Sequence, residues 1–185
     1  MPTEWRVRDI SRAMLPVLLV LSVVEIGSGL VLGEYETTLL TSPSLLVLVP
    51  VTIGTAGNLG SVLAARLSTA FHLGLLEFSP TDDRLAGNAL ATAALSLTVF
   101  PLVGVGAWGA TEVTVGARLA PTTVVAVSTL SGAILGVLAI AVTITTAYAA
   151  YRLGADPDDV VLPVVTNACD VLGVLVLIGT VLLIT

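Results

Sequence analysis

Four residues on one side of the last apolar segment are the strongest candidates for cation chemistry in this sequence. Pro163, Thr166, Asn167 and Asp170 follow one another at i, i+3, i+4 and i+7, so an α-helix places them on one face. A carboxylate at bilayer depth costs about 2.5–3.5 kcal/mol on insertion scales, so it normally faces a water-filled path or a partner. Hard cations such as Mg²⁺ prefer oxygen ligands, and Mg²⁺ keeps most of its waters. The pattern predicts a site for a hydrated cation, with structural pairing of Asp170 to an Arg or Thr as the alternative.

Other kinds of chemistry find little support in the composition. The single cysteine, Cys169, excludes an intramolecular disulfide, and with the single histidine, His72, it gives no cluster of zinc ligands. We find no nucleophile–base pair, zincin motif or phosphate-binding loop, so a membrane enzyme is the weakest hypothesis. The net charge of −6 argues against nucleic acid as a partner.

The elements that must position these residues are membrane-spanning helices. Hydrophobic residues make up 56% of the 185 residues and charged residues only 11%, and the apolar residues form blocks long enough to cross a lipid bilayer. We predict an all-α membrane protein in which a polar segment, residues 1–12, precedes one five-helix domain, residues 13–185. The five spans are expected at about 13–33, 43–70, 85–107, 121–151 and 157–184.

The first and third spans each contain a polar candidate. Ser22, Glu25 and Gly29 share one face of the first span, which suits a water-facing side or a contact between helices. Glu25 either lines the path, is protonated, or bonds to a neighbouring helix. Asn88, which opens the third span, is expected to line the path or to serve structure.

The second span is broken in character. Pro50, Gly54, Gly57 and Gly60 crowd its centre beside Asn58, which predicts a kinked or locally unwound helix. Asn58 either contributes to function or makes a simple packing contact.

Two further patterns favour structure over function. Gly132 and Gly136 form a GxxxG pair in the fourth span, a weak signal because small residues pack any membrane helix. Asp156 is expected to cap the last span with Pro157 at the first helical position, and Asp158 and Asp159 complement the helix dipole. A peripheral cation site at these aspartates is the second interpretation. His72 is expected to lie solvated in the connection 71–84.

The arginines predict the orientation in the membrane. Five spans put the two ends of the chain on opposite sides, and one side then holds six arginines while the other holds only Arg118; the six are Arg6, Arg8, Arg12, Arg66, Arg84 and Arg152. Positive charge favours the cytoplasmic side. We therefore expect a multi-pass protein of the cell membrane with a cytoplasmic N-terminus and an extracellular C-terminus.

Two stretches together resemble a known family. VPVTIGTAGNLGSVLAARLSTAFHLG, residues 49–74, and DPDDVVLPVVTNACDVLG, residues 156–173, are similar in order and separation to the transmembrane domain of the MgtE magnesium transporter family. The GNLGSVLAARLSTA run also resembles the related vertebrate solute-carrier magnesium transporters. The resemblance extends over nearly the whole chain, from about residue 13 onward.

The resemblance implies a five-helix domain that works as a dimer with a cation pore along the dimer axis. In the family the aspartate of the final helix binds hydrated Mg²⁺, and Asp170 matches that position. Pro50, Gly57 and Asn58 match the family's pore-lining segment, and Pro163 matches the proline before the aspartate. Thr166 and Asn167 occupy the pore-facing turn between them.

The sequence also departs from the family pattern. Bacterial members carry an N-terminal cytosolic domain and paired CBS domains, whereas about 12 residues precede the first predicted span here. Gating by such domains is therefore expected to be absent or supplied by another chain. Vertebrate members join two such halves, so this chain is expected to pair with itself or with a paralogue. Ser61 stands where bacterial members often have Gln.

Three functions remain open at this point. The first is a channel or transporter for Mg²⁺ or a similar divalent cation. The second is exchange of that cation against Na⁺ or H⁺. The third is a non-transporting membrane subunit that regulates a partner transporter.

The predicted orientation can be tested with single cysteines in a Cys169→Ala background. We expect Thr37→Cys, between the first two spans, to react with a membrane-impermeant thiol reagent in intact cells. Ser79→Cys, in the next connection, should react only after permeabilisation. The reverse pattern would invert the topology, and labelling of both in intact cells would contradict the number of spans between them.

Overall fold

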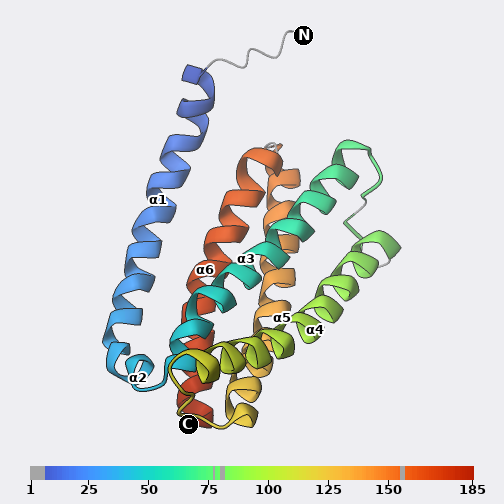
Figure 1. The fold of residues 1–185 in the computed structure, drawn as a ribbon. Coiled ribbons are helices and arrows are strands. Elements are labelled where there is room, and N and C mark those ends of the chain that lie inside the picture. The colour runs from blue at the N-terminus through green and yellow to red at the C-terminus, as the bar shows by residue number, and fades with distance from the viewer. Residues whose placement is uncertain (1–6, 77, 80–81, 155–156) are drawn as a thin grey trace.

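The computed structural model describes residues 7–76, 78–79, 82–154 and 157–185, and these residues form helices and connections without a strand. The helices are α1 (Val7–Glu34), α2 (Glu36–Leu40), α3 (Pro43–His72), α4 (Asp83–Thr114), α5 (Pro121–Leu153) and α6 (Pro157–Ile184) (Figure 1). Five of the described helices are long and apolar enough to cross a membrane. The predicted all-α fold with five spans is confirmed.

Three local predictions are wrong. The connection 34–42 contains the short helix α2, and α4 continues to Thr114, where a loop from residue 108 was expected. Gly116, with φ of 81°, follows the end of α4 and its N–H bonds to the Thr111 carbonyl at 2.9 Å. A left-handed residue of this kind ends helices, and no residue between 108 and 114 supplies that conformation. His72 is the exposed last residue of α3, where a position in the connection was expected.

The second span is one α-helix, so local unwinding of its glycine-rich centre is also wrong. α3 runs unbroken through Pro50, Gly54, Gly57 and Gly60. Gly57 and Gly60 are buried in helix contacts, and this packing supports a helix that glycine would otherwise weaken. α6 begins at Pro157 as predicted, and the expected cap Asp156 lies outside the described residues.

The helices differ in how closely they pack. α3, α4, α5 and α6 form the bundle, whereas α1 lies along one side and contacts only α6 and α2 among the helices described (Figure 1). Only 6% of the apolar span of α1 is buried, against 44% for α5 and for α6. α1 is therefore the peripheral helix of the fold.

Small residues bring α4 and α5 into close contact. A Cβ on Gly132 would lie 2.1 Å from Cγ of Phe100, whose side chain is fully buried. A Cβ on Gly136 would lie 2.6 Å from the hydroxyl oxygen of Ser96. Ser96 donates to the Gly132 carbonyl at 2.6 Å, and Ser128 donates to the Phe100 carbonyl at 2.6 Å. The GxxxG pair thus serves helix packing.

Hydroxyl groups also connect two other helix pairs. Ser44 on α3 and Thr111 on α4 bond through their hydroxyl oxygens at 2.6 Å, and Ser131 on α5 bonds to Thr180 on α6 at the same distance. Such bonds between membrane helices contribute on average about 0.6 kcal/mol each. Because lipid is as apolar as leucine, these bonds and close packing hold the bundle together.

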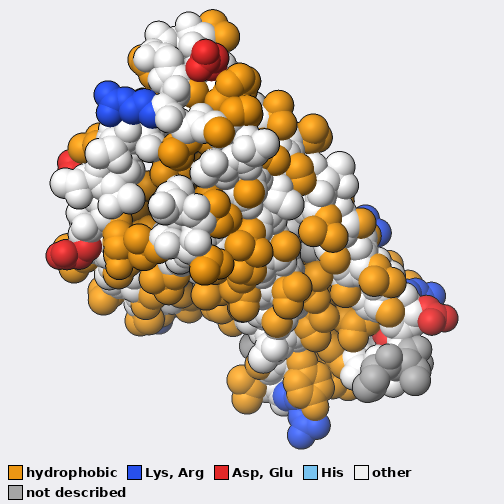
Figure 2. All heavy atoms as spheres, turned by 90° about the horizontal axis from the view of Figure 1, so that it is seen from below, with side chains coloured by type: hydrophobic (Ala, Val, Ile, Leu, Met, Phe, Trp, Pro, Cys, Tyr) orange, Lys and Arg blue, Asp and Glu red, His pale blue; other side chains and the backbone are white. Residues whose placement is uncertain are grey.

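The outer surface is suited to lipid. Figure 2, a view from below at one end of the helices, shows many hydrophobic side chains there too, with the few charged side chains at its margins. Exposed large hydrophobic residues are most numerous on α1 and α4, for example Leu19, Val23, Leu97 and Leu102. The five apolar helices and the exposed hydrophobic side chains are those of a multi-pass membrane protein.

Gly132→Ala is expected to destabilise the protein, because its Cβ has no space beside Phe100. Overpacking of this kind costs about 1–3 kcal/mol. The measurement is the melting temperature in detergent, monitored by fluorescence-detection size-exclusion chromatography. Gly106→Ala on α4 is the matched control, because nothing lies within 4 Å of its added Cβ. Equal melting temperatures for the two variants would contradict the packing described.

Candidate functional site

Glycines on α3 allow α6 to approach closely at the height of Asp170. A Cβ on Gly57 would lie 3.2 Å from Oδ1 of Asp170 and 3.7 Å from Cγ2 of Thr166. One turn further along α3, a Cβ on Gly60 would lie only 2.7 Å from Cγ1 of Val165. The structure therefore brings together Gly57 from one predicted motif and Asp170 and Thr166 from the other.

The carboxylate of Asp170 is available to a ligand. Asp170 is half-buried, and its side chain makes no hydrogen bond or ion pair within the described part of the chain. Thr166 donates its hydroxyl proton to the Leu162 carbonyl of its own helix at 2.9 Å. Its oxygen lone pairs are thus the part of this side chain that remains for a cation or water.

An exposed polar stripe on α3 continues the site beside Asp170. Pro50, Gly54, Gly57 and Asn58 follow at i, i+4, i+7 and i+8, and all but the buried Gly57 are exposed. The Asn58 side chain makes no hydrogen bond within the residues described, while its carbonyl accepts from the Ser61 hydroxyl at 3.1 Å. The stripe thus presents the free Asn58 amide on α3, next in sequence to the Gly57 that lies against Asp170.

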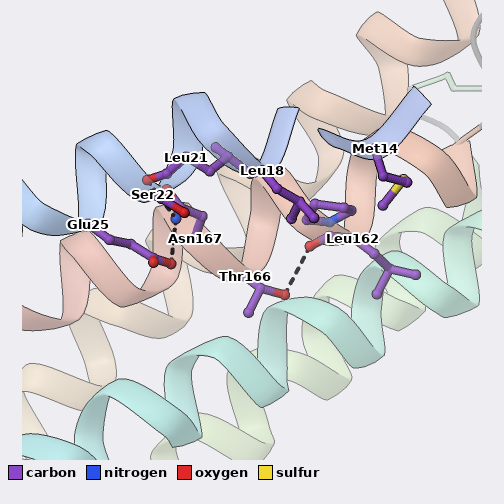
Figure 3. A pocket seen from close by; sticks show the side chains of 9 residues that line it. Met14, Leu18, Leu21, Ser22, Glu25, Leu162, Thr166 and Asn167 are labelled. Carbon is purple, nitrogen blue, oxygen red and sulfur yellow. Dashed lines mark hydrogen bonds between the residues drawn. The ribbon is translucent and has the colours of Figure 1, made fainter. Parts of the chain in front are cut away.

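Asn167 faces the peripheral helix α1 instead. Its side chain is 5% exposed, and its Nδ2 donates to Oε1 of Glu25 at 2.5 Å and to the Leu21 carbonyl at 3.3 Å. Figure 3 shows Glu25 pointing from α1 toward Asn167 on α6. Of the alternatives for Glu25, a bond to a neighbouring helix is thus observed.

A groove of about 450 Å³ runs between α1 and α6 (Figure 3). Its polar end holds Ser22, Glu25, Thr166 and Asn167, and its remaining lining is Met14, Leu18, Leu21, Leu162 and Pro163. Sequence patterns indicated the face of Ser22 and Glu25, but they carry no signal for the Leu21 carbonyl, because every residue has one.

Asn88 lies apart from this site. It bonds to Nε of Arg66 through its side-chain oxygen, and its Nδ2 donates to the Arg84 carbonyl at 2.8 Å. Arg66 is nine residues beyond Gly57 on α3, which is about 13 Å along the helix. Asn88 and Arg66 line a separate groove of about 370 Å³ between α3 and α4. Of the two roles considered for Asn88, these hydrogen bonds support the structural one.

The oxygen donors of the site are of several kinds. The described residues contain no group of three or more His, Cys, Asp or Glu side chains able to hold a metal together. Asp170 instead lies beside Gly57 on α3, whose neighbour in sequence is Asn58, and it shares α6 with Thr166 and Asn167. A set of one or two carboxylates with amide and hydroxyl oxygens suits a hard cation that keeps much of its water.

The fold and the site define a polytopic helical membrane protein with an oxygen-rich site at the contact of α3 and α6. A family model described as MgtE, divalent cation transporter, matches residues 49–180, more than half of the chain. The chain belongs to the MgtE family of divalent cation transporters, a family of transporters and not of enzymes. The match includes the candidate residues on α3, α4 and α6 and leaves Glu25 outside.

Gly57→Ala is expected to weaken divalent cation binding several-fold, because the added Cβ displaces the Asp170 carboxylate from its place against α3. The measurement is the rise in melting temperature with increasing MgCl₂, since a ligand that binds the native state stabilises it. Gly179→Ala, on the side of α6 opposite Asp170, is the control, because its Cβ would meet nothing within 4 Å. Identical Mg²⁺ dependence in both variants would separate Gly57 from the site.

Proposed function

We propose that this protein passes Mg²⁺ across the cell membrane through a pore at the axis of a dimer, with Asp170 binding the hydrated ion. The observation that carries the proposal is the Asp170 carboxylate, which lies against Gly57 without a hydrogen-bond partner in the described residues. Asn58, Thr166 and Asn167 supply oxygens to the ion or its waters, and Pro50 and Pro163 lie along the same path. Mg²⁺ is the cargo and also the ion bound at the site.

The proposed binding is mostly through retained water. Mg²⁺ dehydrates reluctantly, so hydrogen bonds from its waters to carboxylate, amide and backbone oxygens replace most direct ligation. Conduction requires binding that is favourable enough to admit the ion and weak enough to release it. A half-buried carboxylate with neutral oxygens beside it meets both requirements better than a closed cage of charges.

A second copy of the chain is proposed to complete the path. Asp170 and the exposed Asn58 leave polar groups open on a protein that exposes many large hydrophobic side chains. A carboxylate exposed to lipid is costly, so a protein surface or water is expected to cover it. A symmetric dimer satisfies both copies at once, and a paralogous chain with the same stripe would serve equally.

The membrane potential supplies the driving force. An inward-negative potential favours cation entry by about 2.3 kcal/mol per charge per 100 mV, whichever end of the protein faces the cytoplasm. No chemical energy source is needed for downhill movement of a divalent cation in that direction.

The test is Mg²⁺ flux into liposomes that contain only this protein. Wild-type protein is expected to transport, and Asp170→Asn should lower the rate at least tenfold, because loss of a coordinating group typically costs that much in metal affinity. Asp83→Asn, an exposed acid at the start of α4, is the matched control and should transport like wild type.

Other outcomes point to the other candidate functions. Uptake that stops when the Na⁺ or H⁺ gradient is removed would replace the channel with an exchanger. A folded, dimeric wild type without flux would favour the non-transporting subunit. Flux that survives Asp170→Asn would place the ion site elsewhere.

A further inference from the structure

We infer that Glu25 is a positioning residue for the ion path: it binds the amino end of the Asn167 amide and so presents the amide oxygen to the cation. This inference rests on the proposed function, because it concerns the same path. It adds a residue of α1, outside the range of the family match, to a site otherwise built from α3 and α6.

The chemistry of the contact fixes which end of the amide is engaged. A carboxylate and a carbonyl only accept hydrogen bonds, so they can only bind the NH₂ group of an asparagine. Glu25 and the Leu21 carbonyl accept at 2.5 Å and 3.3 Å, one acceptor for each hydrogen of that group. Both donors of Asn167 are thereby directed to α1, and its Oδ1 remains without a donor among the described residues.

The orientation matters because the two ends of an amide act oppositely on a cation. The oxygen attracts a cation and accepts hydrogen bonds from its waters, whereas the NH₂ group repels it. Asn167 is 5% exposed and lies in the groove beside Thr166. Without Glu25, the Leu21 carbonyl alone holds the NH₂ group, and a half-turn of the amide exchanges its two ends.

Because α1 is peripheral, the contact of Glu25 with Asn167 also affects how α1 is held on the bundle. Among the described helices, α1 packs along α6 and otherwise contacts only α2, and most of its span is exposed. The described hydrogen bonds between α1 and α6 are the two made by Asn167. The same contact therefore attaches the peripheral helix and orients a side chain of the path.

Two roles of Glu25 predict different results for a glutamine. If Glu25 acts as a hydrogen-bond acceptor, Glu25→Gln keeps an oxygen for the Asn167 NH₂ group, and Glu25→Ala does not. If its charge binds the ion directly, both variants lose that charge and should be impaired alike.

The experiment measures Mg²⁺ affinity by calorimetry and the KM and maximal rate of Mg²⁺ flux for the wild type and both variants. We expect Glu25→Ala to weaken affinity and raise KM at least tenfold, as losses of supporting groups around a metal typically do. Glu25→Gln should stay within about threefold of wild type. Glu34→Ala, at the exposed end of α1, is the control and should change neither quantity.

Melting temperatures establish that each variant is folded, and Glu25→Gln keeps the test valid if Glu25→Ala is not. Equal impairment of the glutamine and alanine variants would overturn the positioning role in favour of direct charge. An unaffected alanine variant in an active protein would overturn the inference alone. A wild type that neither binds nor transports Mg²⁺ would overturn the proposed function, and this inference with it.

Discussion

The close contact of α3 and α6 is the constraint on which the candidate site depends. Gly57 and Gly60 on α3, and Gly173 on α6, leave space that the opposite helix fills; a Cβ on Gly173 would lie 3.2 Å from Cα of Ile53. Between membrane helices the hydrophobic effect supplies little attraction, so close approach requires small residues. Any larger side chain at these positions would move Asp170 away from the turn that contains Asn58.

Asn167 and Asp170, both on α6, have different surroundings, and this difference is compatible with the proposed transport. Both hydrogens of the Asn167 amino group are bonded to α1, whereas Asp170 has no hydrogen-bond partner in the described residues. A buried amide without partners would destabilise the fold. A carboxylate with a full set of permanent partners would not exchange ions readily. The fold thus fixes the amino group of Asn167 and leaves the carboxylate of Asp170 open.

Much of the architecture was predictable because the apolar blocks are long and the breaks between them are polar or contain proline. The errors arose where packing overrides local preference. The glycines of α3 indicated a kink or local unwinding, and the unwinding is wrong because α6 packs against Gly57 and Gly60 and the helix continues. α4 extends past residue 108 because Gly116 ends it, and α2 forms in a segment too short to be recognised by its periodicity.

The sequence by itself determined the five spans, the shared face of Thr166, Asn167 and Asp170, and the family, because each depends on residue types at regular spacing. Only the tertiary structure decided which side chains meet. It places Gly57 against Asp170 and joins Asn167 to Glu25 by a hydrogen bond. Asn88 instead bonds to Arg66, away from these two contacts. Those contacts depend on how helices far apart in the chain rotate and approach. That geometry is set by the packing of many side chains together, and no single motif encodes it.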